Sequence, residues 1–196
     1  MPYPVGVVPD VSTDEPFNLE DDLLVQRCLQ GDTQSFRVLY RRHQQRVRAI
    51  LYQLCDPTVL DDLVQEVFLR AWKGLPGFRR SAKFSTWLYR ITWNLAADHR
   101  QVVVRGRSQL QTLSKQAPTY QAAPDMMHLH YQDLVQRGLA QLSAEHRMIL
   151  VLHDLEDLPQ KEVAEILSIP VGTVKSRLFH ARAAMREFLH QQGVQL

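Results

Sequence analysis

Apolar side chains recur every three or four residues over most of the chain, which is the spacing of helices with one buried face. The pattern is clearest near the C-terminus, where it predicts one helix over Gln160–Leu167 and a second over Val171–Phe188. Pro170 lies between them and breaks the helical path, because proline lacks a backbone donor. Ala164 is small enough to let the two helices cross closely. These features predict a helix-turn-helix.

The second of these helices has two chemically different sides. One side carries the apolar stripe Val174, Leu178, Ala181, Met185 and Phe188. The other faces carry cations and short polar groups: Thr173, Lys175, Ser176, Arg177, His180, Arg182 and Arg186. A helix of this kind fits the major groove of DNA, where Arg and Lys reach phosphates and guanine edges. The alternative is an ordinary helical pair with a solvated basic face, which the break, the small residues and the clustered cations disfavour.

Four more helices are predicted in the N-terminal half. The first opens at Leu23 and stops near Gly31, and the second covers Phe36–Ile50. A third covers Leu60–Lys73, and a fourth runs to Leu95 with Ser85 or Thr86 as its cap. No strand pattern and no repeat is present. The sequence therefore predicts an all-α chain of two small helical domains joined by a flexible linker, the C-terminal one a helix-turn-helix.

The expected boundaries follow from where the apolar period begins and decays. Residues 1–18 are predicted to be a disordered, acidic and proline-rich tail, and residues 19–105 the N-terminal domain. Residues 106–128 are the linker, residues 129–190 the C-terminal domain and residues 191–196 a short tail.

Charge is distributed unevenly, although the net charge is only +2. The first 26 residues contain six carboxylates and no Lys or Arg, whereas Arg79–Arg107 contains seven cations and the single acid Asp98. Such polarity favours a polyanionic partner. There is no apolar run of membrane-spanning length and no signal peptide, so we expect a cytoplasmic protein without membrane insertion.

Signals for catalysis and metal binding are weak. The sequence contains no HExxH, P-loop, GxSxG or GxGxxG motif, so we expect no enzyme activity and no cofactor. Cys28 and Cys55 lie in apolar helical stretches and are predicted to be buried free thiols. His128 and His130 are two residues apart, which does not bring both rings to one metal on a helix.

Four stretches, taken in order, carry a resemblance to a known family: DDLVQEVFLRAW at 61–72, FSTWLYRI at 84–91, NLAADHR at 94–100 and VGTVKSRL at 171–178. With a linker between the third and fourth, the chain resembles bacterial RNA polymerase sigma factors of the extracytoplasmic-function (ECF) type. The resemblance implies a subunit that binds core polymerase and directs promoter recognition and DNA opening. Core polymerase and promoter DNA would then be its partners. Members are commonly held off by an anti-sigma factor, a further partner that this sequence leaves open.

The resemblance implies three sets of site residues. Docking on the clamp helices of the largest polymerase subunit falls to Asp62, Gln65, Glu66 and Leu69, and the polymerase flap is a further contact. Capture and melting of the minus-ten element fall to Phe78, Arg79, Arg80, Lys83, Arg90, Asn94, Asp98 and Arg100. Reading of the minus-thirty-five element falls to Thr173, Lys175, Ser176, Arg177 and Arg182.

The residues themselves support these roles. On the 60–73 helix, Leu63, Val67, Ala71 and Trp72 are predicted to face the core, which leaves Leu69 among polar groups on the other side. Between residues 78 and 100, cations are mixed with aromatic residues, which is the composition that binds single-stranded nucleic acid. Phe84 and Trp87 are better explained as core.

Two departures from the family pattern concern the helix-turn-helix. Ser168 replaces the usual glycine of the turn, and Pro159 stands where a Ser or Thr cap is common.

The alternative to a sigma factor is a free-standing dimeric regulator, which has no reason to carry residues 61–100. An interaction-only helical protein leaves the cations of the last helix unexplained.

Overall fold

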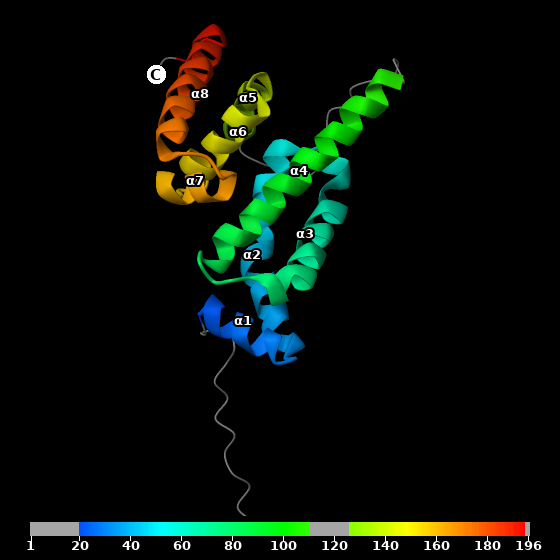
Figure 1. Ribbon diagram of the computed structural model, residues 1–196. Coiled ribbons are helices and arrows are strands. Elements are labelled where there is room, and N and C mark those ends of the chain that lie inside the picture. Colours follow the sequence, from blue (N-terminus) through cyan, green and yellow to red (C-terminus); the bar gives the residue numbers. More distant parts are fainter. Residues whose placement is uncertain (1–19, 110–125, 195–196) are drawn as a thin grey trace, which may run out of the picture.

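Helices account for every regular element of the computed structural model, which describes residues 20–109 and 126–194. The first group consists of α1 (Asp21–Leu29), α2 (Thr33–Leu54), α3 (Leu60–Gly74) and α4 (Phe84–Gln109), with the short turns η2 (Pro57–Val59) and η3 (Leu75–Gly77) flanking α3. The second consists of α5 (Met126–Gln141), α6 (Ala144–Leu150), the π-helical turn η4 (Val151–Leu155), α7 (Gln160–Leu167) and α8 (Val171–Gln191). Figure 1 shows the second group beside the long α4. In the described ranges, the all-α prediction is confirmed.

The N-terminal domain packs α2, α3 and α4 around one apolar core, with α1 against α2. Aliphatic residues at helical spacing fill that core, including Leu39, Val47, Ile50, Leu63, Val67, Ala71, Leu88 and Leu95. Tyr40 and Phe36 pack on Phe68, with ring centroids 4.6 and 6.5 Å away. Asp32 caps α2, because its carboxylate accepts hydrogen bonds from the backbone N–H of Ser35 at 3.3 Å and from its hydroxyl at 2.7 Å.

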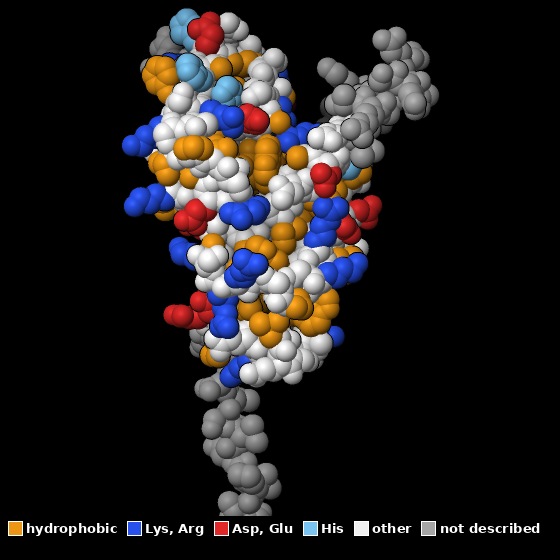
Figure 2. Space-filling model, viewed as in Figure 1, with side chains coloured by type: hydrophobic (Ala, Val, Ile, Leu, Met, Phe, Trp, Pro, Cys, Tyr) orange, Lys and Arg blue, Asp and Glu red, His pale blue; other side chains and the backbone are white. Residues whose placement is uncertain are grey.

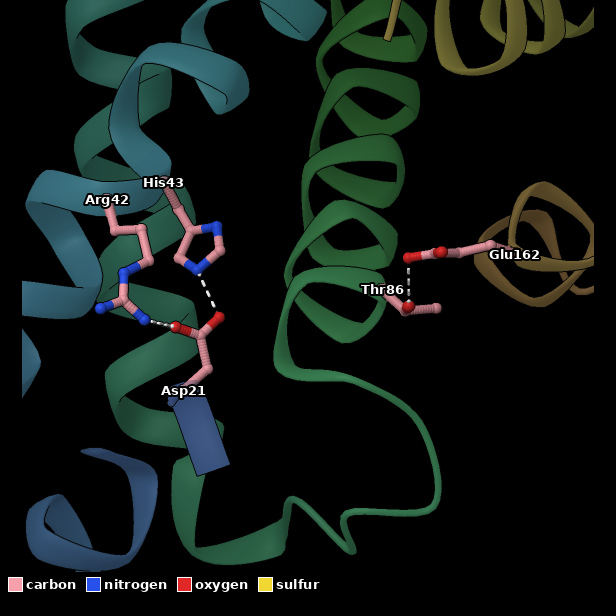
Figure 3. Close-up of polar contacts among 5 residues, drawn as sticks. All are labelled: Asp21, Arg42, His43, Thr86 and Glu162. Atoms are coloured by element: carbon pink, nitrogen blue, oxygen red, sulfur yellow. Dashed lines mark hydrogen bonds and ion pairs between the residues drawn. The ribbon is translucent and has the colours of Figure 1, made fainter. Parts of the chain in front are cut away.

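A partly buried polar contact joins α1 to α2. His43 Nε2 and Asp21 Oδ2 are 2.7 Å apart in a hydrogen bond, and the Arg42 guanidinium donates to the other oxygen of the same carboxylate (Figure 3). The His43 ring lies 5.4 Å from that of Phe84, so the contact also reaches the start of α4. Burial alone would raise the pKa of Asp21, but the hydrogen bonds and charges of His43 and Arg42 outweigh it and lower that pKa.

The predicted cap of α4 is wrong. The helix begins at Phe84, so neither Ser85 nor Thr86 precedes it. Thr86 is buried in the first turn, and its hydroxyl donates instead to Glu162 of α7 at 2.9 Å (Figure 3). Thr86, which the sequence predicted as a possible helix cap, therefore makes a contact between the two domains.

The expected buried face of α3 is correct except at one residue. Leu63, Val67 and Ala71 are buried, whereas Trp72 remains 38% exposed. Its ring packs edge-on against Phe36 at 4.8 Å instead of entering the core. The core position is taken by Phe68, one turn earlier, which is 4% exposed.

In the C-terminal domain, α7 and α8 form the predicted helix-turn-helix, with α7 at the predicted residues. Ser168, which stands where the family usually has glycine, ends α7 in the left-handed conformation, at φ 54° and ψ 44°. Along α8, Leu178 and the other residues of the predicted stripe up to Ala181 are buried. Gly138 lets α5 approach α8, because a Cβ there would lie 2.5 Å from the sulfur of Met185.

The domain boundaries lie partly outside the described residues. The predicted tail 1–18 and the centre of the predicted linker, 110–125, belong to the undescribed ranges. At its two ends the expected linker is helical, since α4 continues to Gln109 and α5 begins at Met126.

The two domains touch each other. α7 packs on α4, while α6 and η4 pack on α2. The side-chain amide of Gln136 on α5 donates to Gln53 of α2 at 2.8 Å. Since α4 also carries four of the candidate minus-ten residues, the contact falls beside that candidate surface.

Candidate nucleic-acid and polymerase interfaces

The outer face of α3 presents an apolar side chain among polar ones. Asp62, Gln65 and Leu69 are exposed, and Glu66 is half-buried beside them. Leu69 is 51% exposed, whereas Leu63, Val67 and Ala71 on the opposite face of the helix are in the core. An exposed leucine ringed by carboxylates and an amide suits docking of another protein.

Arg70 ties this face of α3 to α4. Its Nε donates to Glu66 Oε1 at 2.8 Å and its Nη1 to Asp98 Oδ2 at 3.3 Å. The hydrogen bond to Glu66 contributes most to raising the pKa of Arg70, so the side chain is a permanent cation between the two carboxylates. A candidate polymerase contact and a candidate DNA contact are thus held by one guanidinium.

The loop that precedes α4 and the first turns of that helix surround a cavity of about 320 Å³. Its wall includes Phe78, which is buried with its ring 4.9 Å from that of Trp87. Arg79 and Arg90 also line the cavity. An aromatic wall with guanidinium groups beside it matches the requirements of an unstacked base and its phosphate.

The residues that the sequence predicted around this cavity differ in how far they are exposed. Arg79, Arg80 and Lys83 are exposed, and Arg80 has a φ of 53°, which bends the loop sharply. Phe84 is 1% exposed and is core, as predicted. Trp87 is half-buried and lines the cavity, so it serves both as packing and as wall.

Arg90, Asn94 and Asp98 follow one another at four-residue spacing and share a face of α4. Asn94 and Asp98 are exposed, which leaves an amide and a carboxylate able to reach base edges. Arg90 is half-buried, and its Nη2 donates to the backbone carbonyl of Glu165 in α7. Its Nε is buried and has no hydrogen-bond partner.

Arg100 lies apart from this row, at the boundary between domains. Its guanidinium is 4.9 Å from the centre of the Trp93 ring, and burial lowers its pKa. Arg147 of α6 is close enough to interact with it: burial first, and repulsion from Arg100 second, lower the pKa of Arg147. Cys55, at the end of α2, lies near both cations, and burial raises its pKa despite them.

Four side chains project from one face of α8 and line a shallow cavity: Lys175, Phe179, Arg182 and Arg186. Phe179 is 71% exposed, which sequence reasoning missed because the residue lies beside the buried stripe. Arg182 makes two hydrogen bonds to the Asp154 carboxylate, at 2.9 and 2.6 Å. Figure 2 shows Lys and Arg side chains over both domains on one face of the molecule.

Arg177 belongs to a different side of α8. Its Nη2 lies 2.8 Å from Glu145 Oε2 of α6. Thr173 is half-buried in the first turn of the helix, and Ser176 is exposed in the second. The candidate minus-thirty-five residues therefore lie on different sides of α8 between Thr173 and Arg182 and do not form a single stripe.

Comparisons with known proteins match both domains. Sigma-70 region 2 matches residues 39–102, and Sigma-70 region 4 matches residues 132–185. The ECF RNA polymerase sigma-E factor of Escherichia coli K12 is 33% identical over 181 residues, which span 85% of this chain and 93% of the relative. The chain is an ECF sigma factor. The corresponding Haemophilus influenzae protein is 32% identical over 174 residues, spanning 84% of this chain and 92% of its own.

The fold agrees with solved sigma factor structures. CnrH in complex with the cytosolic domain of CnrY has a TM-score of 0.68 and 25% identity, covering 87% of this chain and 97% of that one. The sigma factor RpoE in complex with the anti-sigma factor NepR from Bartonella quintana has a TM-score of 0.63 and 25% identity, covering 81% and 98%.

Membership of this family settles the general function. A sigma factor directs RNA polymerase to promoters for transcription initiation, and sigma factors are initiation factors rather than catalysts. The region 2 match contains the candidate polymerase and minus-ten residues, which a free-standing regulator would not carry. In residues 20–109 and 126–194, no helix combines the length and apolarity needed to cross a membrane. The same ranges hold no group of three metal-ligating side chains.

Proposed function

We propose that the sigma factor divides promoter recognition between its domains. The outer face of α3, formed by Asp62, Gln65, Glu66 and Leu69, docks on core polymerase. The loop before α4 and the exposed row of α4 capture and open the minus-ten element. The face of α8 binds the minus-thirty-five element in the major groove.

The cavity before α4 carries this proposal. The cavity places the aromatic rings of Phe78 and Trp87 next to Arg79. Asn94 lies further along α4, the helix that carries Trp87. Unstacking a base costs a few kcal/mol. A pocket that stacks the base and binds its phosphate offsets that cost, so strand opening and sequence reading occur together.

The proposal assigns no covalent chemistry to the chain and places its action in the cytoplasm, with core polymerase. Its residues bind and orient DNA, and the nucleotide chemistry belongs to the polymerase. The aromatic rings of Phe78 and Trp87 and the guanidinium groups of Arg79 and Arg90 in the cavity lining are suited to binding bases and phosphates.

Permanganate footprinting of a reconstituted holoenzyme tests the proposal, since permanganate modifies unpaired thymines. We expect Arg79→Ala/Arg80→Ala to reduce minus-ten reactivity strongly while closed complexes on duplex promoter still form. Arg27→Ala/Arg37→Ala, which removes two cations from α1 and α2, is the matched control and should melt the promoter normally. Unchanged reactivity in the Arg79/Arg80 variant would remove the loop from strand opening.

An anti-sigma factor is a further proposed partner. Its support is that both structural neighbours were solved in complexes, CnrH with CnrY and RpoE with the anti-sigma factor NepR. The full chain used as bait in its own host should capture a protein that competes with core polymerase. Capture of core polymerase without such a competitor would contradict this part of the proposal.

A further inference from the structure

Two arginine side chains come together at the boundary between the domains without a carboxylate to balance their charges. Arg100 projects from α4 and Arg147 from α6, and the two guanidinium groups are close enough to repel each other. Within residues 20–109 and 126–194, neither group forms an ion pair with a carboxylate. Burial lowers the pKa of both, and repulsion from Arg100 lowers that of Arg147 further. The described chain thus brings two positive charges together and supplies no negative one.

Each of these guanidinium groups also has a buried N–H without an acceptor. In the part of the chain that the structure describes, Arg100 Nη1 and Arg147 Nε are both buried and make no hydrogen bond. Such groups are unfavourable, and about nine in ten buried polar groups in folded proteins have a partner. Two free donors on neighbouring cations indicate an acceptor that carries negative charge.

Other contacts hold the two side chains in place and leave these donors free. Arg147 Nη2 donates to the backbone carbonyls of Ala140 and Leu142, at 3.1 and 3.3 Å, and these bonds do not use its Nε. The Arg100 guanidinium lies 4.9 Å from the centre of the Trp93 ring. A cation on an aromatic face needs no N–H for that contact. Because both groups are already positioned, binding an anion costs little side-chain entropy.

The charge and the donors suit a phosphate ion. Guanidinium groups bind carboxylate and phosphate oxygens through paired N–H donors, in hydrogen bonds roughly twice as strong as neutral ones. A carboxylate balances one positive charge, whereas a phosphate group carries about 1.5–2 negative charges near pH 7. Its tetrahedral oxygens also accept hydrogen bonds from two helices at once.

A small ion can reach this place from solvent. Arg100 and Arg147 are both half-buried, and so is Cys55, which lies near both cations at the end of α2. The cluster therefore borders water on one side while its two free donors are buried. Entry of an ion requires neither domain to unfold.

We infer that Arg100 and Arg147 form a binding site for a phosphate dianion at the domain boundary. The ion accepts hydrogen bonds from Arg100 Nη1 and Arg147 Nε and cancels their repulsion. The sequence assigned Arg100 to the minus-ten element. Free phosphate and the DNA backbone are thus two sources of the same chemistry, and the inference commits to free phosphate.

Thermal unfolding of the full chain at constant ionic strength gives the first test. Inorganic phosphate should raise the wild-type Tm by several degrees, since a ligand of the folded chain stabilises it. Arg100→Met keeps an apolar side chain against Trp93 and removes the repulsion. Without phosphate it should be at least as stable as wild type, and with phosphate less stable.

A matched control removes the general effect of phosphate, which stabilises proteins by exclusion from their surface. Arg37→Met takes away an exposed cation of α2 and should respond to phosphate as wild type does. A reversed order of stability, confined to Arg100→Met, is not expected of an arginine with a merely structural role.

Isothermal titration calorimetry with inorganic phosphate measures binding directly. Wild type and Arg37→Met should bind one ion per chain, and Arg100→Met should bind it at least tenfold more weakly. Arg147→Lys keeps the charge but lacks Nε, so its affinity should fall between those of wild type and Arg100→Met. This variant separates the hydrogen bond from the charge.

Two results overturn the inference. One is phosphate binding by Arg100→Met with wild-type affinity, which would place the ion elsewhere on the chain. The other is a wild-type chain that binds no phosphate. If holoenzyme with Arg100→Met then also binds a single-stranded minus-ten oligonucleotide more weakly than wild type, this guanidinium belongs to the DNA backbone instead.

Discussion

Arg177 and Arg186 differ in what already holds them. Arg177 pairs with Glu145 at 2.8 Å and is half-buried, whereas Arg186 is exposed in the C-terminal half of α8. A guanidinium held in one orientation can recognise a base edge with little loss of side-chain entropy. A mobile cation is better suited to phosphates, which line the whole groove.

We therefore expect Arg177→Ala to relax preference at one position of the minus-thirty-five element and to cost about 1–3 kcal/mol. Arg186→Ala should weaken binding to all sequences about equally and reduce the salt slope by roughly one ion. Holoenzyme binding to a library of minus-thirty-five variants at several salt concentrations measures both. Identical sequence profiles for the two variants would refute this division of labour.

Asp21 gives the fold a specific acid sensitivity. Burial opposes its ionisation, but His43 and Arg42 lower its pKa below the ordinary 3.8. The folded chain thus binds the Asp21 proton less readily than the unfolded chain does. The stabilisation is complete above pH 3.8 and is lost as pH falls through the lower folded pKa.

Chemical unfolding of wild type and Asp21→Asn between pH 5 and pH 3 checks this sign. The difference in unfolding free energy between the two proteins should stay constant down to about pH 3.8 and shrink as the pH falls further. Asp133→Asn, at an exposed aspartate paired only within its own helix with Arg137, is the comparison. A constant difference across the window would contradict the role given to Asp21.

At the scale of elements, one helix can bury a leucine on one side and expose another leucine on the opposite side. On α3, Leu63 is 7% exposed and Leu69 is 51% exposed. Leu69→Glu should retain helical content and thermal stability but weaken binding to core polymerase by about 2 kcal/mol or more, as for an interface hot spot. Leu63→Glu should instead unfold the domain. Circular dichroism and a core-polymerase binding assay separate the two, and unfolding of Leu69→Glu would show that the docking face was misassigned.

The turn between α7 and α8 stores a small strain. Ser168 has a φ of 54°, a conformation that a side chain disfavours and glycine adopts freely. We expect Ser168→Gly to raise the unfolding free energy of the C-terminal domain by about 0.5–1 kcal/mol. Ser143→Ala removes a cap of α6 and should lower it by about 1 kcal/mol. A loss of stability in Ser168→Gly would mean that the hydroxyl, rather than the backbone, matters there.

For the whole molecule, sequence patterns predicted each domain but not how the domains meet. The helical period located α7 and α8, because burying one face leaves a repeat in the sequence. The contact between Thr86 and Glu162 leaves no repeat, since Thr86 reads as a cap and Glu162 as an acid favouring the first turn of its helix. The sequence likewise did not predict the cavity before α4, because the cavity depends on how the loop folds in space against the helix.

The position of Cys55 turns a native thiol into a reporter. Burial raises the pKa of Cys55, and the charges of Arg100 and Arg147 only partly offset that rise. The thiolate is the species that reacts with alkylating reagents. Cys55 should therefore be alkylated slowly in the folded chain and faster once the chain is unfolded. Cys28, 5% exposed in the N-terminal core with its pKa raised to about 11, should react more slowly still and calibrates the rate within the same molecule.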